Sequence, residues 1–262
     1  MSGMRHLADE LGSRAIVLRT GAYREASREL GRPVVVHEPT SHAAADLVAR
    51  LQVDGLAEEV LPTPMFALSR TDFDAWAGER GTFRMEDFYR AQRRRFEVLM
   101  DGDEPVDGRW NLDAENREPP PKGCATPDVS GPWLPTEDAI DDAVRRDLDA
   151  VDLTTVGGDG PRLFAVTVDE ARRALAQFLD ERLPHFGPPE DAMLTADWAM
   201  AHSLLSVPLN LGLLHPLDAV RAAYRAGTCR CRARRGSCGR CWVGTCWRPT
   251  TARRERWRGC GG

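Results

Sequence analysis

The first hundred residues alternate between two kinds of apolar pattern. Three segments space their apolar residues as an amphipathic helix does, and two shorter β-branched or aliphatic runs separate them: helices at 4–11, 23–30 and 43–51, strands at 15–18 and 33–37. The order helix, strand, helix, strand, helix predicts a parallel sheet with crossover helices. Two further helices are predicted at 73–76 and 85–100. We therefore expect an α/β region over residues 1–100.

The pattern changes in the second half of the chain. Residues 101–160 are rich in Pro, Gly and Asp and carry one clear helical pattern at 138–148, which is typical of an interdomain connector. Thr167 and Glu170 then have the spacing of a capping box, and apolar residues at helical spacing follow them. Residues 161–227 are therefore predicted to be all helical.

The helix predicted at 85–100 carries basic residues on the face opposite its apolar side chains, namely Arg90, Arg93, Arg94 and Arg95. Two interpretations of this pattern are possible, a contact with nucleic acid and a charged face exposed to solvent. The solvated face is favoured, because no aromatic residues interleave with these arginines to stack on bases.

Charge divides the chain at about residue 227. Residues 1–227 carry 25 basic and 39 acidic groups, whereas residues 228–262 carry 10 and 1. No run of about 18 apolar residues and no secretory h-region is present, which argues against membrane insertion and secretion and favours a cytoplasmic location. Arg outnumbers Lys by 34 to 1, as a GC-rich genome would produce.

The most informative segment is H-S-L-L-S-V-P-L-N-L-G-L-L-H-P at 202–216. Ser203 and Ser206 lie where a helix is predicted to begin, and hydroxyls together with unpaired N–H groups at such an end can hold a phosphate. Ser206, Leu209 and Leu213 would share one face. An ordinary capped core helix explains the same pattern, so the residues alone leave both interpretations open.

Five segments in order carry a resemblance to a known family: M-R-H-L-A-D-E-L at 4–11, M-E-D-F-Y-R-A-Q-R-R at 85–94, G-R-W-N-L-D-A-E-N-R at 108–117, F-G-P-P-E-D-A-M at 186–193 and the segment at 202–216. From residue 4 to about 227 the chain resembles the deoxyribodipyrimidine photolyase-related proteins, the group of bacterial iron-sulfur cryptochromes and (6-4) photolyases. Its H-S-L-L-S segment also resembles the T-S-x-L-S-P-x-L segment of ordinary photolyases, which contacts flavin phosphates.

The resemblance implies a fold class and a function. The fold is a Rossmann-like α/β domain with an incomplete parallel sheet, followed by the first part of an all-helical FAD-binding domain. The function is light-driven repair of pyrimidine photoproducts in DNA with FAD as cofactor, or blue-light reception without repair. DNA containing UV photoproducts is the implied partner, and no obligate protein partner is expected. The family also carries a lumazine antenna and a [4Fe-4S] cluster.

The resemblance also assigns site residues. Ser203 and Ser206, with the backbone at Leu204 and Leu205, are expected to face the FAD pyrophosphate. His202 and Asn210 are the next candidates for contact with this cofactor. No catalytic residue and no metal ligand is assigned. The connector residues Trp110, Asn111, Asp113, Asn116 and Arg117 are expected to form a structural clamp between domains. His185 and His215 are expected to be structural.

The tail at 228–262 departs from the family and holds six of the seven cysteines. Three interpretations compete: a metal knuckle built on Cys238 and Cys241, a basic nucleic-acid tail in which Trp242, Trp247 or Trp257 stack on bases, and a frame error. With suitable choices of GC-rich codons, residues 227–243 read one base earlier give G-D-V-P-L-P-R-A-A-G-F-V-R-Q-V-L-G-W, which resembles the family's E-G-F-I-R-Q-I-I-G-W-R-E-Y. The frame error is therefore favoured over a metal site.

A frame error has consequences for the whole protein. The remaining FAD contacts and the four cluster cysteines would be absent. The family's first strand and its L-G-D-Q-L-like loop would be absent before Met4, which would impair antenna binding. We expect a chain truncated at both ends, poorly soluble and inactive in repair.

Overall fold

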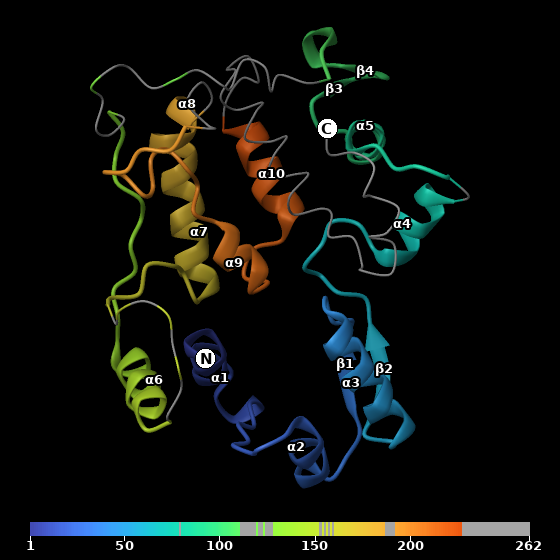
Figure 1. Cartoon of the computed structure of the whole chain (residues 1–262), viewed down its shortest axis with the longest axis vertical. Helices are drawn as coiled ribbons and strands as arrows, with labels where there is room; N and C mark the ends of the chain where they lie inside the picture. Colours follow the sequence, from blue (N-terminus) through green and yellow to red (C-terminus); the bar gives the residue numbers. More distant parts are fainter. Residues whose placement is uncertain are drawn as a thin grey trace.

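The computed structural model describes most of the chain before residue 227, namely residues 1–78, 80–110, 119, 123, 128–151, 154, 156, 158, 160–186 and 192–226 (Figure 1). The tail at 228–262, with its six cysteines, lies outside the described residues. So do the connector positions Asn111, Asp113, Asn116 and Arg117.

The first part of the chain follows the predicted alternation with one exception. Its elements are α1 (Ser2–Leu11), η1 (Gly12–Arg14), α2 (Tyr23–Leu30), β1 (Val34–His37), α3 (His42–Val53), β2 (Ala57–Leu61), α4 (Arg70–Ala77) and α5 (Met85–Phe96). The short strands β3 (Met100–Asp101) and β4 (Glu104–Pro105) then form an antiparallel hairpin, and η2 (Val106–Gly108) follows. The helical region contains α6 (Ala139–Asp149), α7 (Val168–Gln177), the π-helical turn η4 (Phe178–Arg182), α8 (Leu183–Phe186), α9 (Ser206–Asn210) and α10 (Pro216–Arg225).

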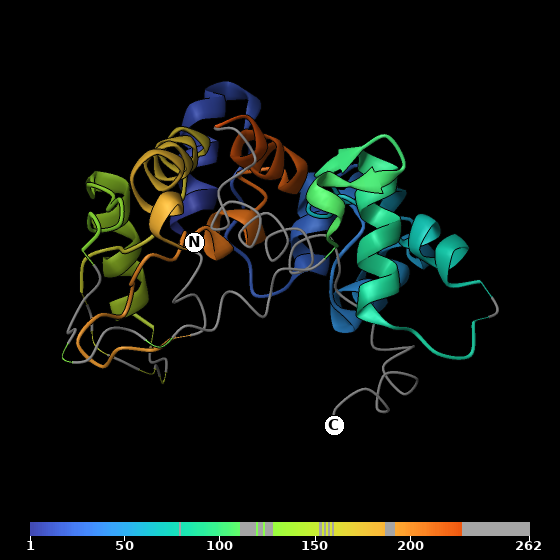
Figure 2. The ribbon, with the colours of Figure 1, turned by 90° about the horizontal axis from the view of Figure 1, so that it is seen from above.

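A small parallel sheet confirms the α/β character of the first part. Strands β1 and β2 pair in parallel, with Val36 opposite Val60, and α3 makes the crossover between them. Strand β2 was not predicted, because Glu58 and Glu59 interrupt its apolar run. Figures 1 and 2 place this sheet with α3, α4 and α5 on one side of the molecule, away from α6 and α7.

The strand predicted at 15–18 is wrong. These residues follow η1 without regular structure, and Ile16 and Val17 are 63% and 61% exposed. A strand is held by pairing with a neighbour, and no strand among the described residues pairs with this segment. Its apolar run is therefore not sufficient to form a strand here.

Helix α5 is shorter than predicted, because it ends at Phe96 instead of residue 100. Glu97 and Leu99 both take a left-handed backbone with φ of 56°, and the Val98 N–H donates to the Arg93 carbonyl at 3.1 Å. This turn directs Val98 and Leu99 into the main core. An apolar periodicity cannot show such a turn, since Val98 and Leu99 fit an extended helix equally well.

The prediction that the arginines of α5 form a solvated face is correct for only some of them. Arg90 pairs with Glu86 at 3.0 Å and Arg95 with Asp72 at 2.8 Å, whereas Arg93 is 3% exposed. Arg93 donates to the carbonyls of Val98, Leu99, Arg109 and Trp110. The interpretation of Arg93 as solvated is therefore wrong, because its side chain satisfies the backbone of the turn after α5 and of the segment that ends at Trp110.

Local capping fixes the starts of the helices in the second part. Asp138 with Asp141 and Thr167 with Glu170 form complete capping boxes at α6 and α7, and the second of these confirms the sequence prediction. His215 caps α10, where its Nδ1 accepts from the Leu217 N–H at 3.3 Å. This role fits the structural assignment of His215.

The main apolar core lies in the helical region. It gathers buried side chains from the end of α5, from α7 to α10 and from the loop before α9: Val98, Leu99, Ala165, Ala171, Phe178, Leu179, Leu183, Leu205, Leu209, Leu214, Leu217, Val220 and Ala223. Burial of these side chains away from water is the principal stabilising force of the region. A second, aromatic cluster of Phe73, Trp76, Phe83 and Phe88 packs α4 on α5.

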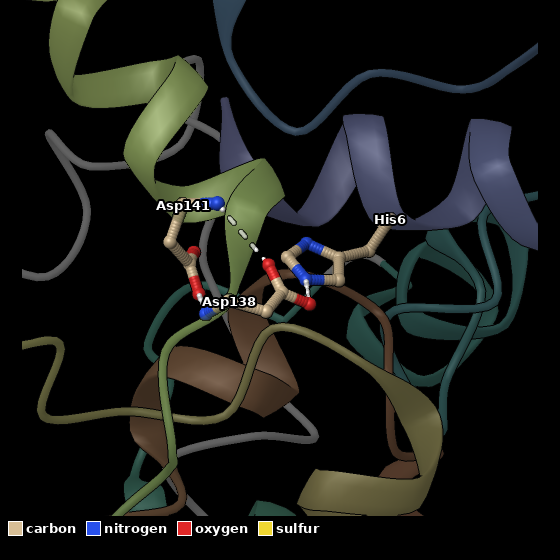
Figure 3. Close-up of side chains that lie close together, drawn as sticks. All are labelled: His6, Asp138 and Asp141. Carbon is tan, nitrogen blue, oxygen red and sulfur yellow. Dashed lines mark hydrogen bonds and ion pairs between the residues drawn. The ribbon is translucent and has the colours of Figure 1, made fainter.

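Helix α1 packs on α6 through a polar cluster (Figure 3). The His6 Nε2 lies 3.1 Å from Asp138 Oδ2, and its Nδ1 lies 3.0 Å from the Ser2 carbonyl. The Ser2 hydroxyl donates to Asp141, which also accepts from Arg162 at 3.1 Å. Because both ring nitrogens of His6 face acceptors, the doubly protonated imidazolium fits this site best.

Burial opposes the charge of His6, but the Ser2 carbonyl and the carboxylates of Asp138 and Asp141 together raise its pKa above the usual 6.5. The pKa of Asp138 is lowered: burial opposes its charge, but the N–H groups of Asp141 and Ile140 and the His6 ring outweigh that cost. Both shifts favour the charged forms of the pair.

None of the helices in the described residues combines the length and the apolar character needed to cross a bilayer.

We predict that Leu183→Ala lowers the free energy of unfolding by about 2–5 kcal/mol, because Leu183 is fully buried in the main core. Leu211→Ala is the control, since Leu211 is 53% exposed, and we expect it to cost less than about 0.5 kcal/mol. Urea unfolding followed by circular dichroism measures both. Equal midpoints for the two variants would contradict this placement of the core.

We also predict a pH-dependent contribution from His6. Its pKa is raised in the folded chain, so the stabilisation is fully present below about pH 6.5 and is lost as the pH rises through the folded value. His6→Gln should therefore lower the free energy of unfolding by about 1 kcal/mol at about pH 5.5 and by much less at about pH 8.5. Asp138→Asn keeps a good helix cap but removes the carboxylate, and it should abolish the same pH dependence. A His6→Gln cost that is constant with pH would refute the assignment.

Candidate functional site

The segment at 202–210 forms a tight loop and the short helix α9, which spans Ser206–Asn210. The helix is shorter than its apolar run suggests, because the chain turns at Gly212 with φ of 71°. Leu213 lies beyond it, so the predicted shared face of Ser206, Leu209 and Leu213 is wrong. Ser206 is exposed at the start of α9, while Leu209 is buried in the main core.

Two successive residues before α9 have backbone conformations of opposite handedness. Leu204 is left-handed with φ of 55°, and Leu205 is right-handed with φ of −83°. A left-handed conformation is strained for leucine and persists only where the surroundings impose it. Alternation of this kind turns consecutive N–H groups toward one side, as in the backbone nests that bind anions.

Several N–H groups of this segment are available to a ligand. The Leu205 N–H donates to Ser203 Oγ at 3.4 Å, and the Leu209 N–H donates to the Leu205 carbonyl at 3.0 Å. The N–H groups of Leu204, Ser206 and Val207 find no acceptor among the described residues. Pro208 has no N–H, so it adds no further donor. Ser203 Oγ acts as an acceptor here, which leaves its own hydrogen available for donation.

A shallow pocket adjoins this segment, and the space of about 330 Å³ that its walls delimit includes open solvent. Ser203, Leu204, Arg182 and Gln177 line part of it, and the rest of its wall is apolar or aromatic: Pro132, Trp133, Leu163, Phe164, Ala165, Ala174, Phe178 and Pro208. The few polar groups therefore lie beside aromatic rings, as in many sites for small ligands.

The other two predicted residues have structural contacts. The His202 ring packs edge-on against Phe186 with centroids 5.4 Å apart, and its carbonyl accepts from Arg182 at 3.2 Å. Asn210 is exposed and its Nδ2 donates to the Ser206 carbonyl at 2.8 Å, which closes α9. The structure thus brings Ser203, Leu204 and Ser206 together with available donors, and it gives His202 and Asn210 supporting positions.

Arg182 holds the loop at 199–202 through hydrogen bonds to its backbone. Its guanidinium donates to the carbonyls of Ala199, Met200 and His202 in the loop and to that of Ser130 in the connector. Asp197 fixes the same loop, since its carboxylate accepts from the N–H groups of Ala199 and Met200 at 3.0 and 2.8 Å.

Burial lowers the pKa of Arg182, while the charges of Asp197 and Glu181 act in the opposite direction. Arginine nevertheless keeps its charge in proteins, so this group is a buried cation.

Sequence reasoning missed Arg182, although a signal was present. Arg182 comes four residues after Phe178 and three after Leu179. Residues at these spacings lie on the same side of a helix, so Arg182 falls on the apolar face. A charged residue on such a face points to a buried role.

Trp110 is the described member of the predicted connector clamp. The guanidinium groups of Arg90, Arg93 and Arg94 lie 5.6, 5.1 and 4.6 Å from the centre of its ring. These cation–π contacts attach the connector to α5 and fit the expected structural role. They also supply the aromatic partner that the arginine face lacked in the sequence.

His6, Asp138 and Asp141 offer one ligand atom each within 4.8 Å, which is close enough for a metal ion. Their atoms are engaged elsewhere, however, because Asp141 binds Ser2 and Arg162 and Asp138 caps α6. Arg162 would also repel a cation at this position. The cluster is therefore better suited to holding α1 on α6 than to binding a metal.

Comparison with known proteins gives an independent measure of relationship. Residues 1–160 match the family model of the deoxyribodipyrimidine photo-lyase-related proteins. The chain is also 36% identical over 248 residues to a (6-4) photolyase of Agrobacterium fabrum (strain C58 / ATCC 33970). That alignment covers 86% of this chain and 47% of the relative, so the chain spans about half of the relative's length.

The family model extends from α1 through the connector into α6, and the identity to the (6-4) photolyase extends over most of the chain. On this evidence the chain belongs to the deoxyribodipyrimidine photolyase-related family.

Proposed function

We propose that the loop at 202–207 binds the pyrophosphate of FAD, and that the protein acts with this cofactor in light-driven repair of pyrimidine photoproducts in DNA. The observation that carries the proposal is the set of N–H groups of Leu204, Ser206 and Val207, which have no acceptor among the described residues. Backbone donors that lack protein acceptors are well suited to phosphate oxygens.

The residues present fit this group. The Ser203 and Ser206 hydroxyls add donors to the N–H groups that have no acceptor among the described residues, and Arg182 provides a positive charge in the adjoining pocket wall. Trp133, Phe164 and Phe178 offer apolar surface for an uncharged part of the same ligand. FAD, when bound, would supply the light-driven electron transfer. The chain's own contribution is to bind and orient the pyrophosphate and to exclude water from it.

The DNA substrate follows from the family and from the relative. The Agrobacterium protein is a (6-4) photolyase, which favours repair over photoreception for the present chain. A damaged dinucleotide must leave the base stack to reach a buried cofactor, and weakened pairing at a lesion makes this easier. Binding of FAD without lesion splitting under light would instead support a blue-light receptor.

We further propose that the residues after Gly227 result from a change of reading frame. The support is that suitable codons yield the peptide G-D-V-P-L-P-R-A-A-G-F-V-R-Q-V-L-G-W, which resembles the stretch that follows the segment at 202–216 in the family. The nucleotide sequence around Gly227 tests this directly. Codons that cannot encode that peptide one base earlier would refute the proposal.

We predict that Ser206→Asp weakens FAD binding by at least about tenfold, because a carboxylate at the start of α9 repels the pyrophosphate. The same carboxylate is favourable at a helix N-terminus, so the variant should fold as well as the wild type. Flavin fluorescence titration measures affinity, and thermal unfolding measures stability.

Ser206→Asn is the matched control, since it has nearly the same size and no charge, and its affinity should stay within about threefold of the wild type. Equal affinities for the Asp and Asn variants would show that the pyrophosphate does not lie at α9. A wild-type chain that binds no FAD would contradict the proposed function as a whole.

A further inference from the structure

Arg182 is an unusual cation for this chain. It is 2% exposed, and its guanidinium forms no ion pair with any described carboxylate. Arg162 shows the usual arrangement, because it is also largely buried but pairs with Asp141 at 3.1 Å and Glu170 at 2.8 Å. A buried charge without a counter-charge is costly unless another group stabilises it.

The hydrogen bonds of Arg182 leave part of its capacity unused. Nε and Nη2 are engaged with the carbonyls of the loop at 199–202, and Nη1 donates to the Ser130 carbonyl. Each Nη carries two hydrogens, so one N–H of Nη1 has no acceptor among the described residues. Arg182 lines the pocket together with Ser203 and Leu204.

Arg93 provides an internal comparison. It is 3% exposed and likewise binds backbone carbonyls, with no ion pair to a described carboxylate. Its charge is stabilised by the ring faces of Tyr89 and Trp110, at 5.5 and 5.1 Å. No ring among the described residues lies over the Arg182 guanidinium, and Arg182 lines the pocket instead.

The loop that Arg182 holds is the one whose backbone is strained. Met200 and Leu204 are left-handed with φ of 43° and 55°, and the carbonyls bound by Arg182 lie at 199, 200 and 202. By holding these carbonyls inward, the guanidinium fixes the direction in which the chain continues. The N–H groups of Leu204, Ser206 and Val207 then remain unpaired within the described residues.

We propose that Arg182 is the positioning residue of the anion site and its buried counter-charge: it holds the loop so that these N–H groups are available. The charges of Asp197 and Glu181 act on Arg182 without a direct ion pair, and a bound pyrophosphate would supply the direct counter-charge that no described carboxylate provides. The inference deepens the proposed function and rests on it. Because Arg182 is only 2% exposed, its attraction for a dianion is weakly screened compared with that of a surface arginine.

The test uses the full chain, with inorganic pyrophosphate as probe and isothermal titration as readout. Arg182→Met should lower pyrophosphate affinity by about tenfold or more, and it should flatten the dependence of affinity on NaCl concentration, because one cationic contact is lost. Arg182→Lys keeps the charge, but its ammonium group cannot bind carbonyls on both sides of the loop. Its affinity for pyrophosphate should therefore be about threefold lower than that of the wild type.

Arg93→Met is the matched control. It removes an equally buried arginine that binds carbonyls, and it should lower stability while pyrophosphate affinity and its salt dependence stay within about twofold of the wild type. A purely structural role for Arg182 predicts that folded variants at 182 and 93 behave alike in both measurements.

The outcomes separate the two proposals. If the wild type binds pyrophosphate and the folded Arg182→Met variant binds it with the same affinity, the proposed role of Arg182 is overturned. The proposed function is then unaffected. If that variant does not fold, Arg182→Lys decides, and wild-type affinity in it overturns the role equally. A wild-type chain that binds neither pyrophosphate nor FAD overturns the proposed function and this inference together.

Discussion

The candidate site depends on one interaction, the contact of the Arg182 guanidinium with the backbone carbonyls of the loop at 199–202. Together with the Asp197 carboxylate, which accepts from the N–H groups of Ala199 and Met200, it holds a strained backbone that is left-handed at Met200 and Leu204, with φ of 43° and 55°. The core packs around the same point, since Phe178, Leu179 and Leu183 surround Arg182 in sequence and are all buried. Strain at the loop is thus maintained by packing and hydrogen bonding elsewhere.

Buried arginines serve as backbone anchors at two places in this fold. Arg182 joins the connector at Ser130 to the loop before α9, and Arg93 joins the turn after α5 to the segment ending at Trp110. Irregular segments have carbonyls that no helix or sheet satisfies, and the fork of a guanidinium can bind several at once. This chain has almost no lysine, so arginine performs this task throughout.

The first and second parts of the chain are also joined by α1. This helix packs on α6, and the cluster of His6, Ser2, Asp138 and Asp141 makes the contact polar and pH-sensitive. Residues at the start of the chain therefore support the helical region that carries the loop at 202–207. A division of the chain into independent parts by composition does not capture this contact.

The sequence by itself determined most helices, the β1 strand, the α/β character of the first part and the family. Those features rest on local properties, such as apolar periodicity, the Thr167–Glu170 box and the ordered motifs. It also pointed to Ser203 and Ser206. Only the tertiary structure decided that the run at 15–18 is not a strand, that α5 turns at Glu97 and that Arg93 and Arg182 are buried. Each of these depends on residues distant in the chain, as in the contact of Arg182 with Ser130, and periodicity carries no information about such partners.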